Sequence, residues 1–547
     1  METRAVRPVE MTVGWLPVEI LSIIFLWAAI LDSDNDYAEP WHYVDHARTQ
    51  WFSLTQVCKH WREVALDTSE LWTHIDVGRS IEWLELGLSR SRNRTIDVGL
   101  HSLRTAKRAI RLLSAHVHRL HKLSIHWVPR DAATSETVKA LINKICRMEL
   151  PALVELCVHL GKQMLTDGHN ARLVALRPAC FPSLQTVRFR WAYLPWDSAL
   201  FSQLEVLHLE EVAVPWEEKL PLDIFLAAIE RCVSLEELTL SFALPVQFPH
   251  EDNLPGSDRV VVLPRLRHVH IEWDSVWTNP PEIFQFLEHF QLPPKASLTI
   301  VVEYSVEACC LNSDCEAALE LIPDNLPILN KATSLYLECT PPTGPDTGEA
   351  YYLVETDDDV YLGFTLKNDS ARCKDGKTWT FDVDVQLAGF CALFEDSPHL
   401  TRLTIDTEEY TAEGLETAFS RLPEITIIEA TYTSLDALRE LLAALATPLE
   451  PDSPDGPPVM PKLRSLKIKE LPWDPELLPA IEECLEWRAK RGTELSQLQL
   501  EVYGRPTDED GDIDFEMAQT TQIVSLQMQM NGSVVLLDVP KPVEGTS

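Results

Sequence analysis

The chain has 547 residues and a formal net charge of −37 at pH 7, from 47 Lys and Arg against 84 Asp and Glu. Phosphate backbones and anionic membrane surfaces would repel such a molecule, so neither nucleic acid nor membrane is expected as a partner. The length exceeds one compact core, which predicts about three or four domains or one elongated array of repeats.

The twelve cysteines are scattered and contain no Cys-x-x-Cys pair. This spread favours buried free thiols in a reducing compartment, the cytoplasm or the nucleus, over disulfides or a zinc site. No nucleophile–base set, metal-ligand set or phosphate-binding loop is visible, so we expect no cofactor and no enzymatic activity.

The first apolar segment predicts a helix that begins at Pro17, whose missing N–H is tolerated in a first turn. Its apolar residues recur at helical spacing: Ile20, Ile23, Ile24 and Trp27. The run Ile20–Leu31 is too short to span a bilayer. Glu19 and Pro17 at its start favour an amphipathic helix over a signal peptide.

A second amphipathic segment follows a polar stretch. Its apolar stripe consists of Leu54, Val57, Cys58, Trp61, Val64 and Ala65. Thr68 or Ser69 could then begin a turn that leads into Leu71 and Trp72.

Together these two segments resemble an F-box, with a Leu-Pro start, an Ile/Phe helix, Val-Cys-x-x-Trp-x-x-x-Ala and Leu-Trp. The matching positions are Leu16, Pro17, Glu19, Ile20, Ile24, Phe25, Val57, Cys58, Trp61, Ala65, Leu71 and Trp72. The spacer between the two halves is longer than in the shortest members of the family, as in many fungal F-box chains.

The resemblance implies that this segment binds a Skp-type adaptor of a cullin–RING ubiquitin ligase. A segment this short cannot bury so many large apolar groups by itself. The candidate adaptor-binding residues are Leu16, Pro17, Ile20, Leu21, Ile24, Phe25, Leu54, Val57, Cys58, Trp61, Leu71 and Trp72. The alternative is that the same stripe packs on the first repeat as an N-terminal cap.

Residues 79–130 are locally basic, with 11 Lys and Arg against 3 Asp and Glu. An acidic or phosphorylated substrate could bind there, through Arg90, Arg92, Arg94, Arg104, Lys107, Arg108 and Arg111. We favour the other interpretation, a solvated helix face or an internal counterweight to the acidic remainder of the chain.

From residue 120 onward an apolar-x-x-apolar-x-apolar pattern recurs. Its strong copies are Leu120/Leu123/Ile125, Leu153/Leu156/Val158, Leu184/Val187/Phe189, Leu204/Leu207/Leu209, Leu235/Leu238/Leu240, Leu266/Val269/Ile271, Leu400/Leu403/Ile405, Leu463/Leu466/Ile468 and Leu495/Leu498/Leu500, with weaker copies at Ala332/Leu335/Leu337 and Ile425/Ile428/Ala430. Most neighbouring copies in the first block lie about 31 residues apart, which predicts stacked supersecondary units. The last two apolar positions of each copy fall on one face of a short strand.

Helical patterns lie between the copies, at Pro221–Cys232, Pro281–Phe290, Gln386–Phe394, Leu435–Ala446 and Pro475–Lys490. Strand–helix alternation of this kind predicts an α/β fold, a parallel sheet lined by outer helices. It resembles a leucine-rich-repeat solenoid over roughly three quarters of the chain. The Asn or Cys that the family carries after the strand is replaced by Ala192, Val212, Ala243 and Asp274, so we expect an irregular array.

The predicted organisation has four parts. They are a helical F-box-like domain over 1–78, a basic linker with the first repeat over 79–130, a repeat array over 131–503, and an acidic loop with a C-terminal cap over 504–547. An insertion at 341–379 breaks the array and is either a hairpin or a mobile segment.

The resemblance implies a substrate-recognition subunit of an SCF-type ligase, without catalytic residues of its own. Polar strand residues between the inward apolar positions would bind the target protein. They are Arg188, Arg190, His208, Glu210, Glu237, Thr239, His268, His270, Glu272, Arg402, Thr404 and Asp406. The alternative function is a repeat scaffold that binds proteins without a role in ubiquitin ligation.

Overall fold

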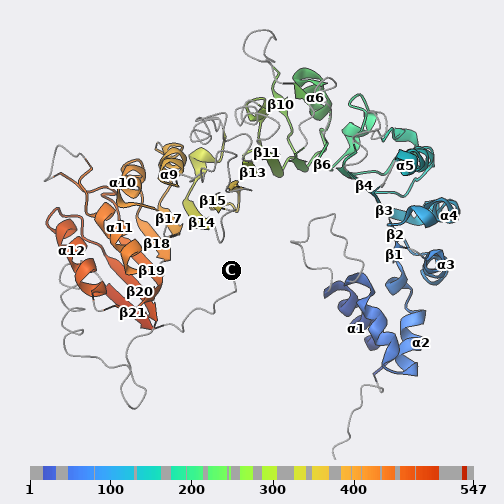
Figure 1. Ribbon diagram of the computed structural model, residues 1–547, viewed down its shortest axis with the longest axis horizontal. Coiled ribbons are helices and arrows are strands. Elements are labelled where there is room, and N and C mark those ends of the chain that lie inside the picture. The colour runs from blue at the N-terminus through green and yellow to red at the C-terminus, as the bar shows by residue number, and fades with distance from the viewer. Residues whose placement is uncertain are drawn as a thin grey trace, which may run out of the picture. The chain divides into compact units, whose positions relative to one another are not determined.

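The computed structural model describes residues 16–31, 47–78, 80–128, 132–161, 174–192, 194–212, 220–242, 246–247, 259–274, 286–304, 326–340, 348–368, 383–395, 397–407, 410–431, 434–449, 456–474, 476–503 and 533–538. The chain divides into two compact units, Met1–Gln247 and Phe248–Ser547, which are described separately (Figure 1). The acidic segment 508–516 lies outside the described residues.

The first unit opens with a helical segment made of α1 (Val18–Leu31), η2 (Ala47–Gln56), α2 (Lys59–Asp67) and η3 (Ser69–Trp72). Strands and helices then alternate. The strands are β1 (His74–Val77), β2 (Ile96–Leu100), β3 (Leu120–Trp127), β4 (Glu155–Leu160), β5 (Thr186–Arg190), β6 (Val206–Glu210) and β8 (Glu237–Ser241), each parallel to the next. The short strands β7 (Leu220–Pro221) and β9 (Val246–Gln247) pair separately.

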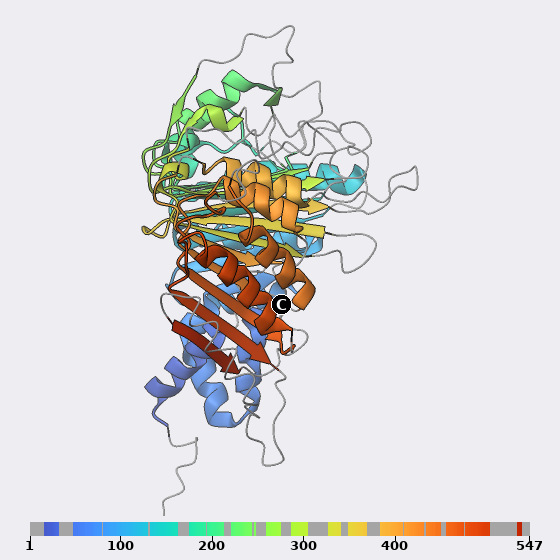
Figure 2. The same cartoon turned by 90° about the vertical axis from the view of Figure 1, so that its left-hand side faces the viewer.

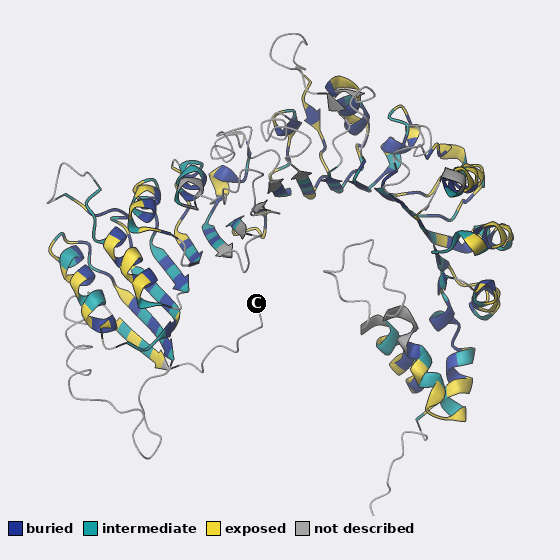
Figure 3. Ribbon diagram, in the orientation of Figure 1, coloured by how far each residue is buried: buried dark blue, intermediate teal, exposed yellow. Residues whose placement is uncertain are grey.

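Helices line one face of this sheet: α3 (Ile81–Arg90), α4 (Leu103–Leu113), α5 (Ala132–Ile145) and α6 (Leu222–Glu230), with short η4 (Val117–Arg119), η7 (Pro178–Cys180) and η8 (Ala199–Gln203) turns. Val187 and Phe189 of β5 pair with Leu207 and Leu209 of β6, and all four are buried. The core therefore lies between strands and helices, as Figure 3 shows, and the intervening polar residues face the other way.

The turn that follows three consecutive strands uses a left-handed backbone without glycine. Trp191, Glu211 and Phe242 have φ values of 58°, 50° and 49°, a region that costs energy for residues with a Cβ. The Trp191 N–H donates to Glu210 O at 3.1 Å, and the Glu211 N–H donates to Ser241 O at 2.8 Å. Main-chain hydrogen bonds thus continue the ladder one residue past the strands.

In the second unit one sheet contains, in spatial order, β11 (His268–Asp274), β13 (Ser297–Tyr304), β16 (Tyr361–Asn368), β15 (Gly348–Glu355), β14 (Ser334–Thr340), β17 (Arg402–Asp406), β18 (Ile427–Thr431), β19 (Ser465–Pro472), β20 (Gln497–Tyr503) and β21 (Ser533–Asp538). Only β15 runs antiparallel to its neighbours among these described strands. The insertion thus forms a hairpin, β15–β16, between β13 and β14.

The helices of the second unit are α9 (Val383–Ala392), α10 (Ala412–Ser420), α11 (Leu435–Leu445) and α12 (Leu477–Ala489), with a short η11 (Leu329–Lys331). Figure 2 shows them along one face of their strands. The strands β10 (Val261–Val262) and β12 (Phe290–Gln291) form a separate parallel pair.

The predicted fold class is confirmed: a helical N-terminal segment precedes strand–helix repeats with mostly parallel sheets. Every copy of the apolar repeat is a strand or leads into one. Four predicted helices are present as α6, α9, α11 and α12, whereas the first half of Pro281–Phe290 falls outside the described residues. The domain boundaries at residues 78, 130 and 503 stay predictions. In the part of the chain that the structure describes, no helix has the length and apolarity to cross a membrane.

Candidate functional site

The N-terminal helical segment has its own small core. Leu21 and Phe25 on the inward face of α1 are fully buried. The core around them also contains Trp51, Val64, Ala65, Leu71 and Trp72. The Phe25 and Trp61 rings lie 5.2 Å apart, and the Trp51 and Trp72 rings meet edge to face at 5.2 Å. Interlocked aromatic rings therefore fix α1 against α2 and η2.

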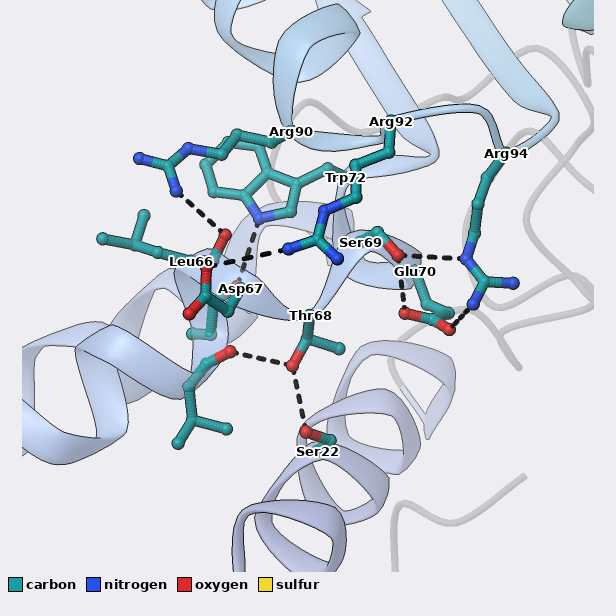
Figure 4. Close-up of polar contacts among 12 residues, drawn as sticks. Ser22, Leu66, Asp67, Thr68, Ser69, Glu70, Trp72, Arg90, Arg92 and Arg94 are labelled. Atoms are coloured by element: carbon teal, nitrogen blue, oxygen red, sulfur yellow. Dashed lines mark hydrogen bonds and ion pairs between the residues drawn. The ribbon is translucent and has the colours of Figure 1, made fainter.

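Polar contacts hold the same helices in register (Figure 4). The Trp72 Nε1–H donates to Ala65 O at 3.1 Å. The Thr68 Oγ1 atom lies 2.8 Å from Val64 O, to which it donates, and 3.0 Å from Ser22 Oγ on α1. These bonds tie the end of α2 to both α1 and η3, so the segment is built to hold α1 in one orientation.

The outward face of α1, defined as Ile20, Ile23, Ile24 and Trp27, is apolar and uncovered by the described residues. These side chains are 44%, 49%, 40% and 61% exposed. Because Leu21 and Phe25 fill the inward face, the helix is apolar on both sides, and such helices are normally buried on both sides. The outward face is therefore suited to contact with another polypeptide.

The structure divides the predicted adaptor-binding residues into three groups. Buried in the segment's own core are Leu21, Phe25, Leu71 and Trp72; half-buried are Leu16, Leu54 and Trp61; exposed are Pro17, Ile20, Ile24, Val57 and Cys58. The predicted set omitted Ile23 and Trp27 of the outward face, although their helical spacing had marked them as part of the apolar stripe.

Three arginines of the basic segment bind the helical segment itself (Figure 4). The Arg90 Nη1 atom donates to Leu66 O at 3.2 Å. Arg92 lies 3.8 Å from Asp67. Arg94 donates through Nε to Ser69 Oγ at 3.0 Å and forms an ion pair with Glu70. We call these contacts the arginine clasp: Arg90, Arg92 and Arg94 join the helical segment to the first strand–helix repeats.

Of the remaining basic candidates, Arg108 pairs with Glu85 at 2.6 Å, whereas Arg104, Lys107 and Arg111 are exposed on α4. Arg90, Arg92, Arg94 and Arg108 therefore act as an internal counterweight, because they interact with groups of this chain. The solvated helix face describes the other three.

Arg119 braces the turn that carries the clasp. Its side chain is 4% exposed and donates to Leu88 O at 2.7 Å, Ser91 Oγ at 2.9 Å and Arg94 O at 3.3 Å, and also to Arg92 O. Burial lowers the pKa of this guanidinium from its usual value. Because Leu88 O lies in the last turn of α3, where carbonyls lack partners within the helix, Arg119 acts as a side-chain cap for that helix, together with the Ser91 hydroxyl.

The polar face of the first sheet carries an ion-pair network. Lys122 and Arg188 lie 2.7 Å and 3.6 Å from Glu155. Arg190 lies 3.2 Å from Glu210. Within the described strands of this unit, the basic side chains of the face are thus balanced by carboxylates of the same face.

Histidines line the same face near the ends of neighbouring strands. His101 and His126 stack at 5.0 Å between ring centroids, and His126 meets His159 at 5.7 Å. Burial, together with the neighbouring His101 and His159, lowers the pKa of His126 to about 3. His126 is therefore neutral at pH 7, while His101 lies 3.2 Å from the Asp76 carboxylate.

The predicted target-binding residues all lie on strands, where they alternate with buried apolar residues and face away from the core. They are Arg188 and Arg190 on β5, His208 and Glu210 on β6, Glu237 and Thr239 on β8, His268, His270 and Glu272 on β11, and Arg402, Thr404 and Asp406 on β17. His208 and Glu210 are only 8% and 9% exposed. That these residues bind a target stays a prediction.

The described residues contain no group of three His, Cys, Asp or Glu side chains that could hold a metal ion. The described cysteines are free thiols, and most are buried. Burial raises the pKa of Cys232 and Cys391 to about 12, so these thiols are protonated and inert at neutral pH.

The comparisons with known proteins agree with the helical segment. The family model described as F-box-like matches residues 14–77. No curated protein matches the chain. Among solved structures, a TLR13–ssRNA13 complex is similar at 11% identity and a TM-score of 0.22, over 78% of this chain and 61% of that chain. Residues 14–77 are therefore an F-box-like domain, which this chain joins to strand–helix repeats.

Proposed function

We propose that this chain is a substrate-recognition subunit of an SCF-type cullin–RING E3 ubiquitin ligase. The F-box-like domain binds a Skp-type adaptor, and the polar sheet faces bind a target protein. The outward face of α1 carries this proposal, because a rigidly held helix presents four large apolar side chains that the described residues leave exposed.

Covering this face contributes a substantial part of the free energy that adaptor binding needs. Its four side chains are about half exposed, so covering each one contributes about 1–1.5 kcal/mol, roughly half the value for full burial. The four together offer about 4–6 kcal/mol before the costs of association. Trp27, the most exposed of them, is the type of residue that dominates such interfaces.

The buried residues of the predicted adaptor set have an indirect role in this proposal. Leu21, Phe25, Leu71 and Trp72 shape the core that orients α1, and the partner contacts Ile20, Ile23, Ile24 and Trp27. The arginine clasp supports a fixed placement of the F-box-like domain on the first repeats. A fixed placement suits a receptor that works by holding a target near the ligase, with no catalytic group of its own.

The direct test is retention of a purified Skp-type adaptor by the full-length chain. We expect wild type to retain it and the Ile24→Asp and Trp27→Ser variants to lose at least tenfold in affinity, because a charge or a lost ring removes central apolar contact. Ile224→Asp is the matched control, since Ile224 is 47% exposed on α6, away from the F-box-like domain.

Equal retention by wild type, Ile24→Asp and Trp27→Ser would contradict this assignment of the interface. A wild-type chain that binds target proteins but no adaptor would instead support the alternative function, a repeat scaffold without a role in ubiquitin ligation.

A further inference from the structure

The hairpin inserted in the second unit brings tyrosines together on the polar face of its sheet. Tyr336 of β14 pairs with Leu353 of β15, which pairs with Gly363 of β16. Tyr351 pairs with Glu338, two positions along the same strands, and its ring lies 6.2 Å from that of Tyr336. Directly paired residues project from the same face, so these residues share one surface.

A buried glycine of β16 lies beside the tyrosines. Gly363 has no side chain, and a Cβ added there would meet only Thr299 and Tyr351, at ordinary contact distances of 3.7 and 3.8 Å. Tyr361, two residues earlier on the same strand, is 37% exposed. The sheet thus presents flat aromatic area around a buried glycine, a kind of surface on which long side chains can lie.

Two carboxylates adjoin the tyrosines. Glu338 of β14 pairs with Asp406 of β17, and the Tyr336 hydroxyl lies 3.1 Å from Glu338 Oε2 and 3.0 Å from Asp406 Oδ2. Burial, with help from both carboxylates, raises the pKa of Tyr336, so the hydroxyl remains protonated. A hydroxyl has one proton and donates to one carboxylate at a time, so the second carboxylate receives no proton from it.

This pair differs from two other carboxylates of the same face. Glu429 forms an ion pair with Lys469, and Glu501 lies 3.3 Å from Lys467. Neither Glu338 nor Asp406 forms an ion pair with any Lys, Arg or His among the described residues. Two adjacent negative charges with one shared donor are best satisfied by a cation with several donors.

We propose that the tyrosine–carboxylate patch, defined as Tyr336, Glu338, Tyr351, Leu353, Tyr361 and Asp406, docks an arginine-bearing segment of the target protein. A guanidinium fork can donate to both carboxylates at once, while its stem and plane lie on the tyrosine rings. This inference rests on the proposed function only in taking the bound partner to be a target protein.

The test uses the full-length chain and a short fluorescein-labelled peptide that alternates Arg with Gly, followed by fluorescence anisotropy. We expect the Glu338→Gln/Asp406→Asn variant to bind this peptide at least tenfold more weakly than wild type. The control Glu395→Gln/Glu483→Gln removes the same net charge from two exposed positions, one just after α9 and one on α12, and should bind within about twofold of wild type.

An equal loss in both double variants would overturn the proposal, because it would reveal general attraction of a cationic peptide to an acidic chain. Absence of wild-type binding would overturn it as well. A matched Lys–Gly peptide should bind more weakly than the Arg–Gly peptide, and equal affinity would refute the fork geometry.

A separate variant tests the tyrosines of the patch, in case the double carboxylate variant misfolds. Tyr351→Ala keeps both carboxylates and should weaken the peptide several-fold; unchanged binding would remove the aromatic part of the proposal. Adaptor retention separates the two proposals, since patch variants should leave it unchanged and Ile24→Asp should leave peptide binding unchanged.

Discussion

Arg119→Met should destabilise the first unit by about 2–4 kcal/mol. The variant leaves Leu88 O, Arg92 O and Arg94 O without their buried donor, at about 1–1.5 kcal/mol for each lost bond. Methionine keeps most of the apolar stem. Removal of a buried charge that forms no ion pair with any described carboxylate returns part of the loss.

The loss should also appear at a distance from the substituted residue. Arg119 fixes the turn that carries Arg90, Arg92 and Arg94, so its removal should loosen the arginine clasp. We expect hydrogen exchange to accelerate at residues 66–72, whose Leu66, Ser69 and Glu70 receive the clasp. Urea unfolding measured by tryptophan fluorescence gives the change in stability.

Arg488 offers the matched comparison in the second unit. Its side chain is 1% exposed and donates to Leu445 O at 3.1 Å, Val459 O at 3.3 Å and Met460 O at 3.0 Å. Arg488→Met should cost a similar free energy but accelerate exchange at 445–460 and not at 66–72. Stability within about 0.5 kcal/mol of wild type for Arg119→Met would refute the reasoning, because that is the range of ordinary surface changes.

Three further predictions follow from other residues. Gly87→Ala should cost about 1 kcal/mol in urea unfolding, because its Cβ would lie 2.8 Å from the Ile75 side chain and the helix propensity gained does not offset that clash. Gly363→Ala should instead stabilise by about 0.5–1 kcal/mol, since its Cβ meets only ordinary contacts in mid-strand; a destabilised variant would contradict this. His126 has a folded pKa of about 3, below its unfolded value, so the unfolded chain binds the extra proton and stability should fall as the pH drops. Between pH 7 and pH 5 this group contributes a loss of about 2 kcal/mol, which His126→Gln should abolish in urea titrations at both pH values; an unchanged pH slope would refute it.

The repeats could be predicted from the sequence because their signal is local. Leu207 and Leu209, two positions apart, place two side chains in the core within one short strand. The strand β2 was missed although Val98 alternates with Leu100, because the leading position of the pattern is Thr95. The strand β1 was missed although Trp72, Ile75 and Val77 fit the pattern, because Trp72 also fits the Leu-Trp end of the F-box. Both strands form by pairing with neighbouring strands, and a local sequence pattern carries no information about that pairing.

The candidate site was predictable only in part. Helical spacing marks both Ile24 and Phe25 as apolar, but which one faces the core depends on how α2 and η2 pack against α1. The arginine clasp joins residues about 24 positions apart, such as Arg90 and Leu66, and needs the tertiary fold. The tyrosine–carboxylate patch depends on the spatial order of the strands, since β15 and β16 enter the sheet between β13 and β14.

The outward face of α1 also sets the conditions under which this chain can exist alone. This exposed apolar face would associate with a second copy of the chain or with a chaperone when no other protein covers it. The chain should therefore aggregate when it is expressed in excess of the protein that binds this face. Co-expression with that binding partner should yield monodisperse protein. The amount of that binding partner, rather than the intrinsic stability of the repeats, would then limit the yield of non-aggregated protein.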